Sequence, residues 1–173
     1  MPDHILERRV WLPRPRPEVF EFFADPGNLS LIQPPWARPR WLAPPPPRLV
    51  AGAVLDFRVP RLPMAWRVMI REFDPPYRFV DVQLRGPFAR WEHRHRFVEG
   101  AHSEPGGTPG IRVEGGANDR PAGAPGTWVE DRVTYRFPAG ALGRLAHALG
   151  GGRRLRGLFD YRDQRLRERF RGG

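Results

Sequence analysis

The stretch RWEHRHRF at residues 90–97 alternates strictly between charged residues and aromatic or histidine residues. A period of two is typical of a β-strand whose two faces differ. One face would carry four charges, and burying them would be costly. We therefore predict that the opposite face points inward, and it carries Trp91, His93, His95 and Phe97.

The same alternation marks a later strand, at residues 127–137. Its predicted inner face is made of Thr127, Val129, Asp131, Val133, Tyr135 and Phe137. A hairpin across Gly86-Pro87 would place Asp81 opposite His93 and Phe79 opposite His95, and His95 would lie near Asp131. For residues 78–84 alternation alone leaves the inner face open, because Val80, Val82 and Leu84 compete with Asp81 and Gln83.

A second hairpin, with Pro60–Pro63 as its turn, joins residues 52–59 to residues 64–73. It would bring together an apolar face made of Leu55, Phe57, Val59, Met64, Trp66 and Val68. The predicted sheet thus has an apolar end and a polar centre. A cavity is a better environment for two histidines and an acid than a solid core, because they can bind a ligand or ordered water there.

The remaining segments give the order of elements. A strand at residues 4–12 precedes a helix that begins near Pro17 and ends at Asp25-Pro26-Gly27, and a short helical turn follows at 28–33. Residues 41–47 are extended. Residues 100–126, rich in glycine and proline, are interpreted as a mobile hairpin loop inside a single domain, 1–173. Residues 139–170 form a helix with a kink or break at 150–152.

Composition excludes several classes of protein. The chain has 173 residues, no cysteine and a net charge of +10. It therefore has no disulfide framework, cysteine-ligated zinc or thiol nucleophile. No apolar run approaches the roughly 18 residues of a membrane span, and the N-terminus lacks the order of a signal peptide. We expect a cytoplasmic protein.

Four groups of residues carry a family resemblance along nearly the whole chain. They are residues 17–26 with Asn28-Leu29 and Pro34-Pro35-Trp36; residues 72–76 with Phe79-Val80-Asp81; residues 85–88 with Trp91, His93, His95 and Phe97; and Gly143-Arg144-Leu145 with residues 158–162. Together they resemble the START-like, polyketide cyclase/dehydrase (SRPBCC) superfamily, in its ligand-binding SRPBCC branch. The loop at 100–126 and the break at 150–152 depart from the pattern.

The resemblance implies an α+β helix-grip fold. A curved antiparallel sheet of six or seven strands would wrap around a long C-terminal helix, with two short helices after the first strand and an elongated pocket inside. It also favours Asp81 and Gln83 facing inward. The superfamily includes carriers, cyclases, hydratases and chaperone regulators, so the fold alone does not choose among them.

We expect the protein to bind or carry a small hydrophobic ligand, lipid-like or polyketide- or isoprenoid-like. The predicted ligand-binding residues are Trp36, Phe57, Met64, Trp66, Asp81, Gln83, Trp91, His93, His95, Asp131, Tyr135, Leu155 and Phe159. The first alternative is an aromatase/cyclase- or hydratase-type enzyme. Its candidate catalytic residues are His93, His95, Asp131 and Asp81, because histidine titrates near neutrality and a carboxylate can orient it.

The sequence also bears on which cofactors and partners the protein would have. We assign no cofactor and no metal, because a His-x-His pair on one strand face is common by chance. The arginine-rich helix at 153–171 suggests docking on an anionic membrane surface. An RNA- or ribosome-associated protein is the second alternative. The exposed side of this helix, however, lacks the interleaved aromatic residues that stack on bases.

Overall fold

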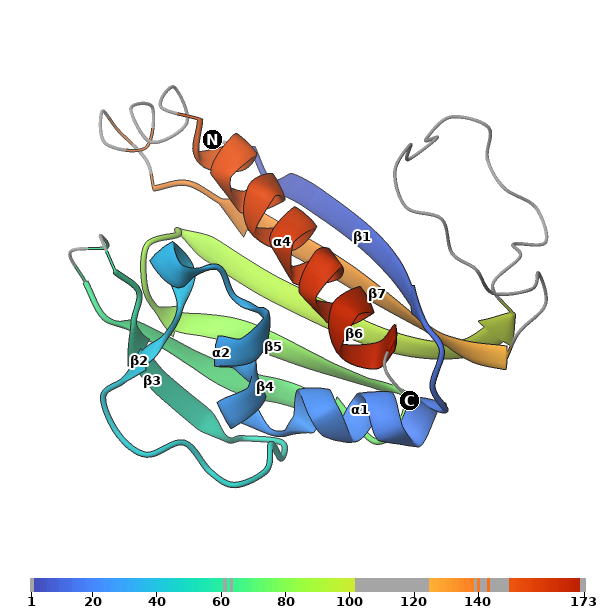
Figure 1. Ribbon diagram of the computed structural model, residues 1–173. Helices are drawn as coiled ribbons and strands as arrows, with labels where there is room; N and C mark the ends of the chain where they lie inside the picture. The colour runs from blue at the N-terminus through green and yellow to red at the C-terminus, as the bar shows by residue number, and fades with distance from the viewer. Residues whose placement is uncertain are drawn as a thin grey trace.

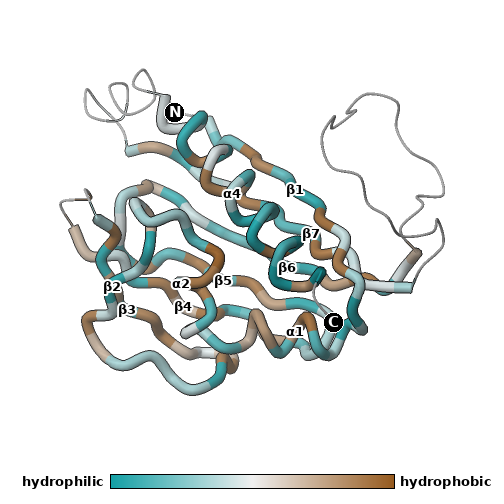
Figure 2. Tube along the Cα trace, in the orientation of Figure 1, coloured by the Kyte–Doolittle hydropathy of each residue, from teal (hydrophilic) through white to brown (hydrophobic). Residues whose placement is uncertain are grey.

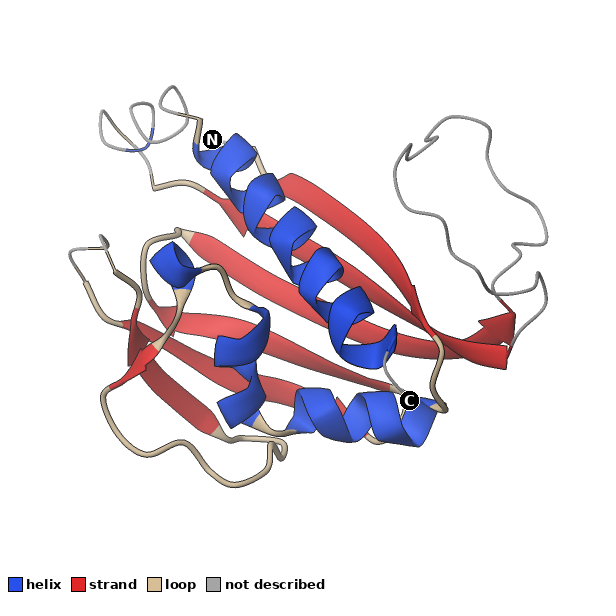
Figure 3. Ribbon diagram, in the orientation of Figure 1, coloured by secondary structure: helices blue, strands red, loops and turns tan. Residues whose placement is uncertain are grey.

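The computed structural model describes residues 2–60, 62, 64–101, 125–138, 140, 143 and 150–171. The strands are β1 (His4–Leu12), β2 (Arg40–Trp41), β3 (Val54–Arg58), β4 (Trp66–Asp74), β5 (Arg78–Arg85), β6 (Arg90–Ala101) and β7 (Pro125–Arg136). The helices are α1 (Arg16–Ala24), α2 (Leu29–Ile32) and α4 (Gly151–Arg171), with 3₁₀ turns η1 (Pro26–Asn28) and η2 (Pro35–Ala37). Figure 3 distinguishes helices from strands.

All seven strands form one antiparallel sheet in the order β1-β7-β6-β5-β4-β3-β2. The first strand pairs with the last, and the other neighbours follow one another along the chain. The helix α4 runs across the side of the sheet formed by β1, β7 and β6, and α1 and α2 lie on the same face (Figure 1). This arrangement confirms the predicted helix-grip fold.

The strand registers agree with those predicted from alternation. Asp81 pairs with His93 and Phe79 pairs with His95 between β5 and β6. His95 in turn pairs with Asp131 between β6 and β7. The inner faces predicted for β6 and β7 are buried at every position. Backbone hydrogen bonding on three adjacent strands therefore places both histidines and both aspartates side by side.

Strand β5 departs from simple alternation. Phe79 and Val80, which are adjacent in sequence, are both buried. The ladder between β4 and β5 is irregular between Ile70 and Glu72, and it is irregular again between Arg67 and Val68. A bulge changes which side chains face inward on either side of it. This explains why the pattern of residues 78–84 did not identify an inner face.

The start of α4 follows the glycine run. Gly150 has a φ of 80°, a left-handed conformation that favours glycine, and α4 begins at the next residue. The predicted break at 150–152 is thus seen as a helix start. Residues 139, 141, 142 and 144–149 of the predicted helix lie outside the described residues.

The interior contains two apolar clusters. The larger one lies around α1 and the ends of the strands near it, and it includes Phe20, Phe23, Phe79 and Phe97. The smaller one contains Leu6, Trp91, Val133, Tyr135, Phe137 and Phe159. Apolar and polar residues alternate along the strands in Figure 2. The histidines and aspartates of the polar centre belong to neither cluster.

The predicted loop between β6 and β7 is described only at its ends. Residues 102–124 lie outside the described residues, while β6 and β7 stay paired as far as Ala101 and Pro125.

Among the helices that the structure describes, none is both long and apolar enough to cross a membrane.

Candidate functional site

Two buried histidines share one carboxylate at the centre of the sheet. His93 Nε2 lies 2.9 Å from Asp131 Oδ1, in hydrogen-bond geometry. His95 Nδ1 lies 2.7 Å from the same oxygen, but its direction does not make a hydrogen bond. The two imidazole rings have centroids 3.8 Å apart. All three side chains are buried, so this contact belongs to the interior of the protein.

Asp81 faces the same pair from the other side. Its Oδ2 lies 3.5 Å from His93 Nδ1 and 3.5 Å from His95 Nε2. The other oxygen, Oδ1, accepts a hydrogen bond of 3.0 Å from Trp91 Nε1. The imidazoles therefore lie between two carboxylates, and each ring has one nitrogen toward Asp131 and one toward Asp81.

Aromatic rings surround the histidines. Phe79 stacks on His95 at 4.1 Å between centroids, and Phe23 of α1 lies 5.9 Å from the same ring. Phe159 of α4 meets His93 edge to face at 5.5 Å. The walls of the polar centre thus come from the sheet, α1 and α4.

The helix α4 adds two charged residues that sequence analysis did not include in the site. Arg162 is 4% exposed and Asp163 is 9% exposed. The guanidinium of Arg162 lies over the rings of Phe23 and Phe159. A signal for Arg162 was present in the sequence: it lies three residues after Phe159, within the apolar stripe of the helix. A charge at such a position indicates a buried ionic contact.

The two histidines differ in their electrostatic environment. Burial lowers the pKa of His93, and the nearby charge of His95 lowers it further, more than Asp131 and Asp81 raise it. Burial also disfavours protonated His95, but the charge of Asp131 and the contact with Asp81 outweigh it and raise the pKa of His95. The pair therefore combines one imidazole that resists protonation with one that favours it.

The carboxylates stay charged despite burial. Burial alone would raise the pKa of Asp131, but the charges of Arg162 and His95 hold it well below its usual range. The pKa of Asp81 is lowered in a similar way, since contacts with the two histidines and Trp91 outweigh the effect of burial. Asp163 behaves differently: burial, followed by repulsion from Asp131, raises its pKa to about 6.

Several buried polar atoms of this region have no hydrogen-bond partner among the described residues. They are Asp131 Oδ2, His95 Nδ1, Arg162 Nε and Asp163 Oδ1. Buried polar atoms in native proteins are nearly always paired. The polar centre therefore has hydrogen-bonding capacity that its own side chains do not use.

The remaining predicted residues divide into four groups, of which three lie in the interior or at its edge. Trp66, Trp91, Tyr135 and Phe159 contribute to the smaller apolar cluster or pack against it. Half-buried Leu155 packs there as well, while Phe57 belongs to the larger cluster and contacts Trp66 at 5.7 Å. Gln83 uses its side chain elsewhere, because it donates a 2.7 Å hydrogen bond to the carbonyl of Phe88.

Two predicted ligand-binding residues lie at the surface. Trp36 in η2 is 42% exposed, and Met64 in the connection between β3 and β4 is 40% exposed. Neither is among the residues in contact with the histidine pair. Both are large apolar residues, and a single sequence does not show whether such a residue in a connection is covered by other parts of the chain.

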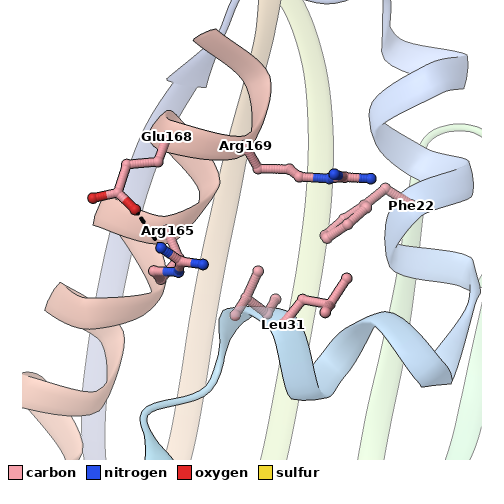
Figure 4. A pocket seen from close by; sticks show the side chains of 6 residues that line it. Phe22, Leu31, Arg165, Glu168 and Arg169 are labelled. Atoms are coloured by element: carbon pink, nitrogen blue, oxygen red, sulfur yellow. Dashed lines mark hydrogen bonds and ion pairs between the residues drawn. The ribbon is translucent and has the colours of Figure 1, made fainter. Parts of the chain in front are cut away.

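A separate pocket of about 310 Å³ lies between α1, α2 and α4. It is lined by Phe22, Leu31, Ile32, Arg165, Glu168 and Arg169. Figure 4 shows Arg165 paired with Glu168 on α4, facing Leu31. None of the predicted ligand-binding residues lines this pocket.

The histidines and aspartates of the polar centre could bind a polar group, transfer a proton or hold a metal ion. The unpaired atoms can bind a carbonyl or hydroxyl group, and the two unlike imidazoles can move a proton. In addition, Asp81, His93 and His95 each direct one potential metal ligand toward the others, and these atoms lie within 4.8 Å of one another.

Comparisons with known proteins agree with this architecture. The structure is similar to that of TTHA0849 from Thermus thermophilus, with 19% identity, a TM-score of 0.56, and coverage of 95% of this chain and 97% of that one. It is also similar to norcoclaurine synthase from Thalictrum flavum, with 10% identity, a TM-score of 0.56 and coverage of 96% of both chains. A third similar structure is Ara h 8.0201, with 12% identity, a TM-score of 0.52, and coverage of 95% and 98%.

At these identities the structural neighbours support the fold alone. No curated protein matches the chain in sequence. A family profile does match, however, and it covers residues 12–158, which include the strands β2 to β7 and both aspartates and both histidines of the polar centre. The chain therefore belongs to the family described as polyketide cyclase / dehydrase and lipid transport.

Proposed function

We propose that this protein binds a small, largely apolar molecule between its sheet and α4. In this proposal His93, His95, Asp131 and Asp81 contact the polar group of the ligand. The aromatic residues around them contact its apolar part. The family to which the chain belongs includes cyclases and lipid-transport proteins, and both handle such molecules.

The observation that carries the proposal is the unused hydrogen-bonding capacity of the polar centre. Asp131 Oδ2 is buried and has no hydrogen-bond partner among the described residues. Leaving such a group unpaired costs about 1–3 kcal/mol. A bound hydroxyl could donate to this carboxylate oxygen and offset that cost.

The apolar surroundings support a ligand with a large hydrophobic part. Trp66 packs against both apolar clusters, and its ring lies 5.1 Å from that of Trp91. Phe88, Leu155 and Leu158 pack on the smaller cluster while remaining half-buried. Incomplete burial makes this end, beside the start of α4, the favoured route from solvent to the histidines.

A second candidate function, an enzyme of the cyclase or hydratase kind, is favoured by the opposite pKa shifts of the two imidazoles. The pKa of His93 is lowered and that of His95 is raised. Such a divided pair provides a base and an acid in one site at one pH. In this candidate His93 would accept a proton from the ligand, and His95 would return one to a carbonyl or hydroxyl oxygen.

The test of binding begins with protein purified without detergent. Native mass spectrometry and solvent extraction should find a hydrophobic molecule that copurifies at close to one per chain. Replacing Phe159 by Asp would introduce a charge into the apolar wall, and we expect it to abolish copurification. Replacing exposed Leu84 by Asp is the matched control, and it should leave the bound molecule in place. Extracts free of any hydrophobe, from folded protein, would count against the proposal.

The enzyme candidate is tested with the molecule so identified. If the protein is an enzyme, His93→Gln and His95→Gln should stop the conversion of this molecule even in protein that still holds it. If the protein is a carrier, the recovered molecule stays unchanged after incubation with wild-type protein.

A further inference from the structure

We propose that Asp81, His93 and His95 form a binding site for a first-row divalent cation, with Zn²⁺ as the reference ion. The sequence alone does not indicate a metal site, because a His-x-His pair is weak evidence without the directions of its nitrogens. The inference concerns the cluster described above. It rests on the positions of nitrogen and oxygen atoms, however, and it does not require the proposed hydrophobic ligand.

The spacing of the three ligand atoms suits a small cation. Asp81 Oδ2 lies 3.5 Å from both His93 Nδ1 and His95 Nε2. Two ligands bound at about 2.0–2.1 Å in tetrahedral geometry lie roughly 3.3 Å apart. The carboxylate is therefore already close to the required distance from each ring, and all three atoms lie within 4.8 Å of one another. A small rotation of the imidazoles would complete the set.

The groups behind the ligands match those of a metal site. Metal-bound histidines usually direct their second nitrogen to a carboxylate, which fixes the ring and its tautomer. Here Asp131 Oδ1 lies 2.9 Å from His93 Nε2 and 2.7 Å from His95 Nδ1. Asp131 thus forms a hydrogen bond with His93 and an electrostatic contact with His95, and the remaining nitrogen of each ring faces Asp81.

Asp81 is held in a comparable way. Trp91 Nε1 donates to Oδ1 of this carboxylate at 3.0 Å, which leaves Oδ2 directed toward the rings. The four groups lie on paired positions of β5, β6 and β7, so the strand ladder fixes their separation. Sites built on strands hold their geometry better than sites built on loops.

Charge and ligand type favour the same class of ion. The carboxylates of buried Asp131 and half-buried Asp81 face the histidines, and one buried arginine, Arg162, acts on Asp131. A divalent cation would compensate the remaining negative charge. Imidazole ligands select zinc, copper, iron or nickel over magnesium or calcium. Three protein ligands also leave at least one position open for water or a polar group of a ligand.

The test uses the full chain after treatment with EDTA. Titration with Co²⁺ should produce the visible absorption bands of a tetrahedral site at one ion per chain, and Zn²⁺ should displace the cobalt. We expect Asp81→Asn and His95→Gln to weaken Co²⁺ binding at least 100-fold. Asp131→Asn should weaken it about 10- to 100-fold. The matched control is Asp160→Asn, which removes an exposed carboxylate of α4 remote from the ligand set and should change affinity less than twofold.

Circular dichroism identifies variants that fail to fold. If Asp81→Asn does not fold, Asp81→Glu replaces it, because glutamate keeps the charge but moves the ligating carboxylate oxygen. Wild-type protein that binds no Co²⁺, or Asp81→Asn protein that binds it as tightly as wild type, would overturn the inference. Extraction of the hydrophobe from EDTA-treated protein separates the two proposals. A retained hydrophobe without Co²⁺ binding rejects only the metal site, and Co²⁺ binding without any hydrophobe rejects only the proposed function.

Discussion

Replacing Asp163 by asparagine should stabilise the protein at neutral pH, because the native fold holds this carboxylate in an unfavourable place. Asp163 is 9% exposed, and its Oδ1 has no hydrogen-bond partner among the described residues. Burial and repulsion from Asp131 raise its pKa to about 6, although Arg162, Arg167 and Arg8 act against the shift. Asparagine has nearly the same shape and carries no charge to desolvate.

The size of the effect follows from linkage between protonation and folding. The folded pKa of Asp163 is about 6 and the reference value is 3.8. Between these values the folded state holds the proton while the unfolded state has released it, so stability falls as pH rises. At about 1.4 kcal/mol per pKa unit, Asp163 lowers the free energy of unfolding by about 3 kcal/mol above pH 6. At pH 5 it lowers this free energy by about half as much.

Urea denaturation of wild type and Asp163→Asn from pH 5 to pH 8 measures the difference between their free energies of unfolding. We expect the asparagine variant to be more stable throughout, with an advantage that grows toward about 3 kcal/mol and then levels off. Asp160→Asn on the same helix is the control for the change in net charge, since the side chain of Asp160 is 67% exposed. A stability advantage that is constant, or that shrinks as pH rises, would show that Asp163 is not held in its protonated form by the fold.

Three further predictions concern the polar centre and its support. Arg162→Met should lower the free energy of unfolding by about 3 kcal/mol in urea denaturation, because it leaves the buried charge of Asp131 without its compensating cation. Adding Asp131→Asn to this variant should recover part of the loss. No recovery would argue against coupling between Arg162 and Asp131. Trp91→Phe should cost about 1–2 kcal/mol by removing the hydrogen bond to Asp81, and an unchanged urea midpoint would show that the bond contributes nothing. Gly126→Ala should lower the melting temperature markedly, because the new Cβ would lie 2.4 Å from the carbonyl oxygen of Leu12; wild-type melting would be inconsistent with that close approach.

Much of the fold could be predicted because alternation is strong on β6 and β7. Charged residues at every second position leave only one face of β6 to be buried, and the structure buries that face. The short turn at Gly86-Pro87 fixes the register between β5 and β6, so the position of Asp81 opposite His93 followed from counting. A long connection joins β6 to β7, and there the inward positions of His93, His95 and Asp131 followed from alternation alone. The inward direction of Asp81 was favoured only by the family resemblance.

Other features depend on three-dimensional contacts that a pattern does not contain. The bulges between β4 and β5 disrupt alternation, so the faces of β5 were ambiguous. Arg162 and Asp163 enter the site from a helix remote in sequence, and their burial depends on how α4 lies on the sheet. Gln83 shares the polar character of the site residues but hydrogen-bonds to its own turn at Phe88. Sequence also does not indicate which nitrogen of each imidazole faces which carboxylate.

Contact between the histidine pair and a ligand can be measured by ¹⁵N NMR of the imidazole rings in EDTA-treated protein, before and after reloading with the hydrophobe recovered by extraction. The resonances of His93 and His95 are assigned by comparison with His93→Gln and His95→Gln. We expect both pairs of ring nitrogens to change their chemical shifts on loading. Saturating hydrophobe that leaves all four nitrogen resonances in place would show that the histidine pair does not contact a ligand.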